Sequence, residues 1–456
     1  MESIPGRFGS PGGGPAGTPI VRPVHPLRPW LIGLIYWIAL IPLTSPPRHS
    51  GNVWSRYMTI ESLVERGTFA IGRSPLLKPS GSPDLARYGG RLYSDKPPVL
   101  AMAGALVYAP LYHWGGMRFA GPRGGFRRFP AVNLVLVSAL VGLASAWSLV
   151  WVRRLLQVTS FRAWVADLLT LGVGFGTPLL TYGVTFNNHS VAAGLIAAAF
   201  GLVTLEDPAR HRVARRRAWA GLFAGLAATI DLPAGGATFL VLGGWLAARQ
   251  RRLPLAYLGG AIGPALLHGA AQWSISGSVL PVELDRAAME YPGSYWASAA
   301  GRFHEAGPRW RFGLELLLGP QGWLTITPSF ALAPLGLALA ARRGPLRGAA
   351  RAASALILAL LGFYIWGVHR TDYAGLSFGV RHLLAIAPLV GWFALVGLDR
   401  VRRRRLGLAF ALASAVGAGY AYEGMRDPWS RADRRPEPAL RILQRLVLCP
   451  RSSYQR

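Results

Sequence analysis

Apolar runs of about 20 residues recur along almost the whole chain of 456 residues. A helix of that length spans the roughly 30 Å hydrocarbon core of a bilayer. Because 52% of the residues are hydrophobic and only 15% are charged, an ordinary water-soluble enzyme is excluded. The sequence predicts an all-α, polytopic transmembrane helix bundle of about 11–12 spans, at 29–45, 129–152, 163–183, 189–205, 218–231, 234–248, 253–274, 322–341, 351–369, 382–399 and 406–421.

Basic residues greatly outnumber acidic ones, with 49 Lys and Arg against 20 Asp and Glu and a net charge of +29. The densest arginine runs lie in short connections between apolar segments, as the positive-inside rule expects of cytoplasmic loops. The charge therefore sets the topology and predicts no nucleic-acid partner. Most acidic residues then fall in outer segments. We predict a multi-pass protein of the cytoplasmic (inner) membrane with its active site on the outer face.

The same rule divides the chain into three parts. Residues 1–28 are rich in Gly, Pro and Arg and are expected to form a disordered cytoplasmic tail. Residues 29–421 form the transmembrane domain, whose large outer loop, 46–128, bears membrane-parallel helices, and 422–456 form a polar, basic C-terminal tail. The apolar segment 97–115 is expected to lie in or along the outer leaflet, because a crossing there would put the later arginine-rich loops outside.

Two of the predicted spans, 218–231 and 234–248, are short and are joined through Asp231-Leu232-Pro233. A carboxylate beside a proline at membrane depth is typical of a functional break. We interpret the pair as a broken hairpin that lines an outward cavity, in place of two full crossings.

The outer loop is predicted to begin with an amphipathic helix at the membrane surface, with Asn52 as its cap and Gly67 as its stop. Glu61 and Glu65 are four residues apart, so they share one face of this helix and can point a carboxylate at a site. The alternative is that both are solvated partners of neighbouring arginines.

The most specific stretch is Tyr93-Ser94-Asp95-Lys96-Pro97-Pro98, directly before the main part of segment 97–115. Proline is tolerated at the start of a helix, where the amides lack intrahelical acceptors. The helix N-terminus and Lys96 then place positive potential at the boundary between membrane and water, which suits a phosphate whose lipid tail lies in the bilayer. The alternative is a snorkelling lysine that only anchors the helix.

An apolar span, an outer helix with Arg56-Tyr57, and then Tyr-Ser-Asp-Lys-Pro-Pro follow one another in this chain. This order resembles the GT-C superfamily of integral-membrane glycosyltransferases, and more narrowly the bacterial relatives of the protein O-mannosyltransferases and of the aminoarabinose transferases acting on lipid A. The resemblance covers 29–205 and is looser afterwards. It implies that Lys96 contacts the phosphate of a polyprenyl-phosphate-linked donor, with Tyr93 and Arg56 beside it.

Further residues are candidates by the same resemblance. Arg128 and Arg381 precede later spans and are donor-phosphate candidates, since a guanidinium group forks onto two phosphate oxygens. Simple interfacial anchoring is the alternative for both arginines. Three residues remain as possible substrate-binding groups: His189, Asp372 and His382.

The catalytic base is the part of the family pattern that this chain lacks. Family members usually carry an Asp-Glu pair just before the Arg-Tyr of the outer helix, and here Val53 and Trp54 stand there. Asp95 is the first candidate for the base because it neighbours Lys96. The other catalytic candidates are Glu61 and Asp84, with Asp372 behind them. For each, a carboxylate that only pairs with a nearby cation is the alternative.

The resemblance implies a glycosyltransferase, for a hexose or a pentose, that moves the sugar from a polyprenyl-phosphate-linked donor to an unknown acceptor with inversion. Its partners would be that donor and membrane lipid. No cofactor is required; a divalent metal is possible but not indicated, and the single Cys449 excludes a cysteine-rich zinc site. The alternative is a transporter or flippase for a lipid or lipid-linked sugar, which would bind at the bilayer midplane between repeated halves.

Overall fold

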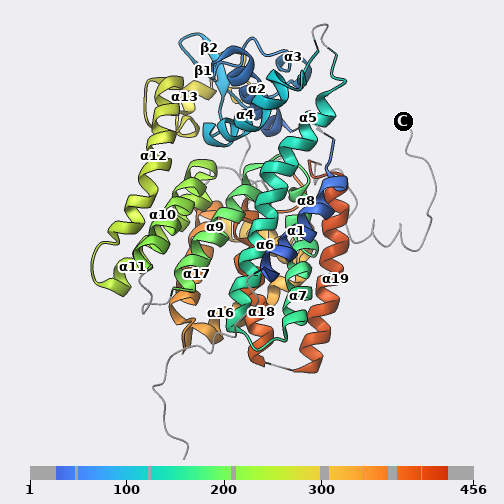
Figure 1. The fold of residues 1–456 in the computed structure, drawn as a ribbon, viewed down its shortest axis with the longest axis vertical. Helices are drawn as coiled ribbons and strands as arrows, with labels where there is room; N and C mark the ends of the chain where they lie inside the picture. The colour runs from blue at the N-terminus through green and yellow to red at the C-terminus, as the bar shows by residue number, and fades with distance from the viewer. Residues whose placement is uncertain are drawn as a thin grey trace, which may run out of the picture.

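The computed structural model describes residues 27–46, 50–121, 125–206, 212–297, 308–342, 344–367, 377–401 and 403–429. These residues form a tall bundle of helices with a smaller cap at one end (Figure 1). In the described ranges the strands are two short ones that pair with each other. The predicted all-α class is therefore confirmed.

Helices that pack side by side make up the bundle. α5 continues through a π-helical turn, Val137–Gly142, into α6, which gives a long stretch without a break. The bundle helices are α1 (Arg28–Leu40), α5 (Phe129–Leu136), α6 (Leu143–Leu155), α7 (Ala163–Phe175), α8 (Pro178–Gly183), α9 (Asn188–Thr204), α10 (Val213–Ile230), α11 (Leu232–Gln250), α12 (Leu255–Ser276), α14 (Arg309–Leu318), α15 (Trp323–Ile326), α16 (Ala333–Arg342), α17 (Arg347–Gly362), α18 (Ala387–Val401) and α19 (Arg404–Arg426).

The sides of the bundle are apolar. Within the described ranges, three helices are long and apolar enough to cross a membrane, and a bent pair can supply a fourth span. A soluble protein rarely exposes a large contiguous apolar patch, and a bilayer removes such a surface from water. The chain is therefore a multi-pass helical membrane protein. Exposed apolar side chains come from helices along the whole sequence: Leu31, Leu34, Ile35, Ile38, Leu168, Leu240, Ile262, Leu266, Leu358, Leu408 and Leu412.

Helices occur in every predicted span, but two of the spans are broken. The predicted span 163–183 divides into α7 and α8, because Pro178 cannot donate a backbone hydrogen bond and Thr177 caps the new helix by accepting from the amide of Leu179 at 3.3 Å. The predicted span 322–341 contains a bend of 104° before Pro328. Neither of these two predicted spans is therefore a single straight helix.

The segment around Asp231 forms a tight helical hairpin. α10 and α11 have 18 and 19 residues, which is about 27 Å and 28 Å at ~1.5 Å per residue. Both helices are longer than the two short segments that the sequence predicted. They approach so closely that a Cβ on Gly235 would lie 2.1 Å from the carbonyl carbon of Ala227. Asp231 joins the two helices, as predicted.

Residues 50–121 and 277–297 form the cap, which lies at the upper end in Figure 1. Segment 97–115 appears here as α4, which packs along α2. Its position in the membrane stays a prediction, but Leu106 and Trp114 are 79% and 88% exposed. The cap elements are α2 (Gly51–Arg66), α3 (Leu77–Ser80), β1 (Leu85–Tyr88), β2 (Arg91–Ser94), α4 (Pro98–His113) and α13 (Arg286–Met289).

The predicted surface helix, α2, differs from the prediction in two ways. Every residue from 53 to 62 is buried within the protein, which is more than one face of an amphipathic helix; its position at the membrane surface stays a prediction. Ser50 takes the N-cap position, and Asn52 is the second residue of the helix, where its side-chain oxygen accepts a hydrogen bond from Arg56. The predicted stop is confirmed: Gly67 has a φ of 63°, and its amide donates to the carbonyl of Leu63.

The last bundle helix runs past the predicted domain boundary at residue 421. α19 ends at Arg426, and Trp429 is buried beside Tyr182 with its indole N–H donating to Thr185. The first residues of the predicted C-terminal tail therefore belong to the bundle, because an aromatic side chain anchors them there. Residues 430–456 lie outside the described ranges, as do 1–26 of the predicted N-terminal tail.

Candidate functional site

A two-stranded hairpin brings two acidic residues face to face. Gly89 and Gly90 both have positive φ and form its turn. The register pairs Leu85 with Ser94, so Asp84 and Asp95 lie opposite each other one step beyond the last pair. The amide of Asp95 points to the carbonyl of Asp84 at 3.5 Å. Like charges placed this way repel, and the pair needs a cation.

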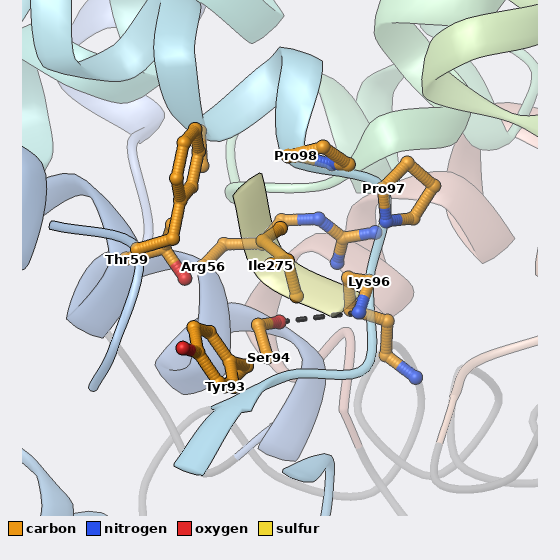
Figure 2. Close-up of a pocket in the computed structure, with 10 residues that line it drawn as sticks. Arg56, Thr59, Tyr93, Ser94, Lys96, Pro97, Pro98 and Ile275 are labelled. Carbon is orange, nitrogen blue, oxygen red and sulfur yellow. Dashed lines mark hydrogen bonds between the residues drawn. The ribbon is translucent and has the colours of Figure 1, made fainter. Parts of the chain in front are cut away.

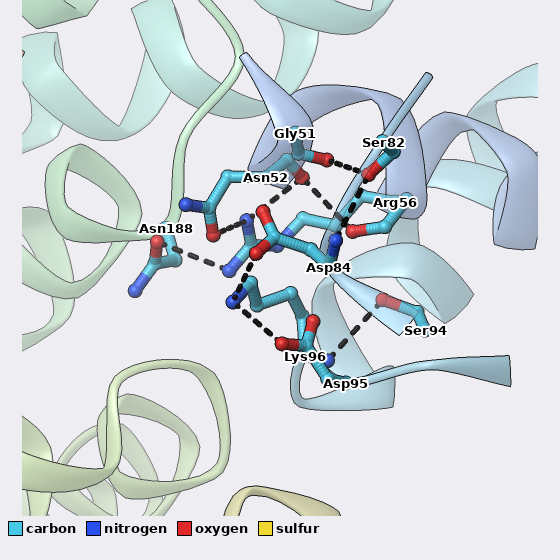
Figure 3. A network of polar contacts seen from close by, with 10 residues as sticks. Gly51, Asn52, Arg56, Ser82, Asp84, Ser94, Asp95, Lys96 and Asn188 are labelled. Carbon is cyan, nitrogen blue, oxygen red and sulfur yellow. Dashed lines mark hydrogen bonds and ion pairs between the residues drawn. The ribbon is translucent and has the colours of Figure 1, made fainter. Parts of the chain in front are cut away.

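Lys96 supplies that cation. Its Nζ lies 3.1 Å from Oδ2 of Asp95 and 3.4 Å from Oδ1 of Asp84 (Figure 3). The side chain of Lys96 is 18% exposed, while both carboxylates are buried. α4 begins directly after it, with Pro97 at the N-cap and Pro98 in the first turn, as predicted. Lys96 therefore lies at the positive end of a helix.

Burial and charge together set the titration of this cluster. Burial raises the pKa of Asp95 to about 6, and Lys96 opposes that shift. Burial lowers the pKa of Lys96, but the negative charges of Asp84 and Asp95 raise it by more. The pKa of Lys96 therefore lies above its usual value. The ammonium group is therefore charged at any physiological pH.

Arg56 extends the cluster from the neighbouring helix α2. Its guanidinium donates to the backbone carbonyl of Asn52 at 3.1 Å and to the side-chain oxygen of Asn188, at the start of α9, at 3.1 Å (Figure 3). Burial lowers the pKa of Arg56 to about 10, Asp84 opposes this, and the charge of Arg381 adds to it. Arg56 and Arg381 therefore lie within electrostatic reach of each other.

A small pocket, with a cavity volume of about 10 Å³, adjoins this cluster. Figure 2 shows its wall, in which Arg56, Tyr93 and Lys96 meet Ile275 from the upper end of α12. One oxygen of Asp95, Oδ1, is buried without a hydrogen-bond partner. The lining of the pocket thus combines two cationic residues with apolar side chains.

A second polar cluster lies where α9, α10 and the segment before α18 meet. Nδ1 of His189 is 2.5 Å from Oδ2 of Asp231, and both residues are buried. The ring of His189 also packs edge-on against His382, which stacks on Tyr364 at 4.7 Å. Asn188 links this cluster to the first one through Arg56. The sequence analysis offers His189 and His382 as separate candidates, and only the structure shows that their rings are in contact.

Arg381 belongs to the same end of the bundle. Its guanidinium lies over the ring of Trp429 at 5.0 Å, and the residue is buried. Its charge acts on Arg56, as noted above. The structure therefore brings Arg381 toward the Lys96 region, although 285 positions separate the two residues in the sequence.

Other predicted site residues are not brought into the cluster. Glu61 is buried in a two-pronged pair with Arg66, so the ion-pair alternative holds for it, although not as a solvated pair. Glu65 accepts a hydrogen bond from Tyr108 at 2.7 Å. Arg128 is exposed and donates to the carbonyl of Gly116. Asp372 lies outside the described residues.

The sequence reasoning missed the segment after α12. Ile275 and Val282 pack with Ala86 and Tyr93 in one apolar cluster, and Asp285 accepts from the hydroxyl of Tyr88 at 3.0 Å. Glu283 lies between these two contacts. The sequence did contain a sign of this residue: Glu283 is an acidic residue within the otherwise apolar run 279–284, in a segment that we predicted to lie outside the membrane.

No group of three His, Cys, Asp or Glu residues in the described part of the chain is arranged to hold a metal ion. Asp84 and Asp95 are both paired with Lys96, and His189 is paired with Asp231. The expectation that no cofactor is required is not tested by this observation.

Comparisons with known proteins give one distant likeness. No protein-family model matches the chain, and no curated protein matches it. The chain is similar to the crystal structure of ArnT from Cupriavidus metallidurans in the apo state, with 13% identity, a TM-score of 0.49, and coverage of 88% of this chain and 75% of ArnT. A likeness at this level is too distant to bear on the site or the reaction.

Proposed function

We propose that this chain is a membrane glycosyltransferase that moves a hexose or pentose from a polyprenyl-phosphate-linked donor to an acceptor hydroxyl at the outer face of the cytoplasmic membrane. The observation that carries the proposal is the position of Lys96. It sits at the start of α4, at the wall of a pocket and above an apolar bundle. The resemblance of its surrounding motif to the GT-C superfamily supports the same role.

The charge distribution supports an anionic ligand at this place. Lys96, Arg56 and Arg381 are three buried or half-buried cations at one end of the bundle, and the charges of Arg56 and Arg381 repel each other. Two oxygens of a phosphate between such groups would relieve that repulsion. Proteins bind phosphate with the ammonium group of lysine and with the forked guanidinium group of arginine, and this end of the bundle offers one lysine and two arginines.

The apolar surroundings support a lipid tail on that anion. Ile275 and Phe69 line the pocket together with the cations, and the bundle below the cap carries an apolar outer surface. We expect the polyprenyl chain to lie against these apolar side chains, while its phosphate contacts the cations.

The proposed reaction is a single displacement. The acceptor oxygen attacks the anomeric carbon of the sugar, the bond from that carbon to the phosphate oxygen breaks, and the electron pair leaves with the polyprenyl phosphate. A carboxylate takes the proton of the acceptor hydroxyl. Lys96 and the arginines stabilise the charge that develops on the leaving phosphate. The configuration at the anomeric carbon is inverted.

Release of free polyprenyl phosphate from lipid-linked hexoses and pentoses by the purified protein tests this proposal. Lys96→Ala should lower kcat/KM by at least about 100-fold, the usual effect of removing one stabilising donor. Lys96→Arg, which keeps a charge between Asp84 and Asp95, should retain part of the activity. Lys78→Ala is the matched control, because Lys78 is exposed on α3 in the same cap and should not affect the rate.

Three results would decide against the proposal. Full activity of Lys96→Ala would remove Lys96 from the reaction. An equal loss of activity in Lys78→Ala would show that the loss in Lys96→Ala reflects the total charge of the cap and not the position of Lys96. Donor binding to the wild-type protein without any release would favour the flippase.

A further inference from the structure

The residues that follow α19 are built into the bundle at the end nearest the cap (Figure 1). The carbonyl of Pro428 accepts a hydrogen bond from the amide of Phe378 at 3.0 Å. The hydroxyl of Tyr182 lies 2.8 Å from the carbonyl of Phe378 and 3.4 Å from that of Pro428. These contacts hold residues 427–429 against α8 and against the stretch that leads into Arg381.

Trp429 places its ring against the guanidinium group of Arg381. Cζ of Arg381 lies over the ring, 5.0 Å from its centroid, and both residues are buried. The indole N–H donates to Oγ1 of Thr185 at 3.0 Å, and Tyr182 packs edge-on against the ring. The ring therefore cannot turn away from the guanidinium group without breaking a buried hydrogen bond.

A contact of this kind holds a guanidinium group without using its hydrogen-bond donors. The attraction joins the positive charge to the face of the aromatic ring, and it engages none of the five N–H groups of the side chain. A carboxylate in the place of Trp429 would compete with a phosphate for those donors. Trp429 and a phosphate can instead hold the same guanidinium group at the same time.

Side-chain contacts connect Arg381 with the wall of the pocket. The ring of the next residue, His382, packs edge-on against His189, with 5.6 Å between the ring centroids. Asn188, directly before His189, accepts a hydrogen bond from Arg56 at 3.1 Å. Arg56 lines the pocket. The tryptophan ring therefore lies at one end of a row of contacts whose other end is the pocket wall.

We infer that Trp429 is a positioning residue, which holds the guanidinium group of Arg381 where it meets the phosphate of the lipid-linked donor. The inference rests on the proposed function and adds to it a residue from the segment after α19. Trp429 acts through Arg381 and does not itself touch the donor. Loss of the ring should therefore have no effect on phosphate binding once the guanidinium group is absent.

Equilibrium binding of radiolabelled polyprenyl phosphate to the purified full-length protein in detergent tests this inference. Trp429→Ala should raise the Kd by about 10-fold, which is within the range of a buried cation–π contact. Trp429→Phe keeps a ring face and should stay within about threefold of the wild type. The double variant with Arg381→Ala should bind like Arg381→Ala alone, because the two side chains act as one unit.

Met425→Ala is the matched control. It removes a buried apolar side chain from the same end of α19 but takes no aromatic ring from Arg381. Both Met425→Ala and Trp429→Ala should lower the Tm, since both open space in the core. Only Trp429→Ala should raise the Kd for polyprenyl phosphate.

The outcomes separate this inference from the proposed function. If the wild type does not bind polyprenyl phosphate, both are wrong. If it binds and Trp429→Ala leaves the Kd unchanged, or raises it equally when Arg381 is absent, the positioning role is wrong and the proposed function stands. An equal rise in Met425→Ala would indicate a loosened helix end and would also overturn the inference. A coupled effect on binding, without release of polyprenyl phosphate from any lipid-linked sugar, would support the positioning role and contradict the transfer reaction.

Discussion

Replacement of Glu283 by glutamine should stabilise the protein, and the gain should depend on pH. Both of its carboxylate oxygens are buried and have no hydrogen-bond partner in the described part of the chain, apart from its own backbone amide. Burial raises the pKa of Glu283 to about 7, against an ordinary value of 4.5. The folded protein therefore holds this proton more tightly than the unfolded chain does. The stability that the protonated group contributes is fully present below about pH 4.5 and is lost as the pH rises through about 7.

The size of the effect follows from the interval between the two pKa values, 7 − 4.5, which is about 2.5 pH units. At ~1.36 kcal/mol for each pH unit, the wild type loses roughly 3 kcal/mol of unfolding free energy across this interval. Glutamine cannot ionise and loses none of it. Glu283→Gln should therefore match the wild type near pH 4.5 and exceed it by roughly 3 kcal/mol above pH 7.

Intrinsic tryptophan fluorescence during heating, in one detergent, can follow this difference from pH 5 to pH 8. The Tm of Glu283→Gln should exceed that of the wild type by on the order of 5 °C at pH 8 and by much less at pH 5. Glu290→Gln is the matched control, since its partner Arg286 is exposed in the same segment. A difference in Tm that stays constant with pH, or a less stable Glu283→Gln, would refute the account of a buried, unpaired carboxylate.

Two further predictions concern packing. Gly235→Ala should destabilise the α10–α11 hairpin by roughly 2 kcal/mol, because its Cβ would meet the backbone of Ala227. Gly236→Ala is the control and should be neutral, because no atom lies within 4 Å of its Cβ position. Equal Tm values for the two variants would contradict the close approach of the helices. Glu61→Gln should cost roughly 3 kcal/mol by leaving Arg66 without its buried partner, read as a lower Tm than that of Glu290→Gln, and an unchanged Tm would show that the pair is not structural.

The fold class followed from the sequence because the length of an apolar run is a property of neighbouring residues. A run of about 20 apolar residues satisfies its backbone only as a helix when it lies in lipid. The helix start at Pro97-Pro98 and the stop at Gly67 are local in the same sense.

The differences from prediction occur where side chains or whole elements meet in ways that the residue pattern does not show. Asn52 reads as a helix cap, but Arg56 takes its side-chain oxygen. The helix from residue 51 reads as amphipathic, with one buried face, yet α4 and the hairpin cover most of its residues. Glu61 reads as a candidate base, and Arg66 pairs with it instead.

The sequence by itself determined that the chain is a helical membrane protein and that a helix begins directly after Lys96. Only the tertiary structure decided which groups share that place: Asp84 opposite Asp95, Asn188 on Arg56, and Asp231 on His189. The physical reason is that the free energy of a charge depends on burial and on partners far away in the chain. Spacing along a sequence contains neither quantity.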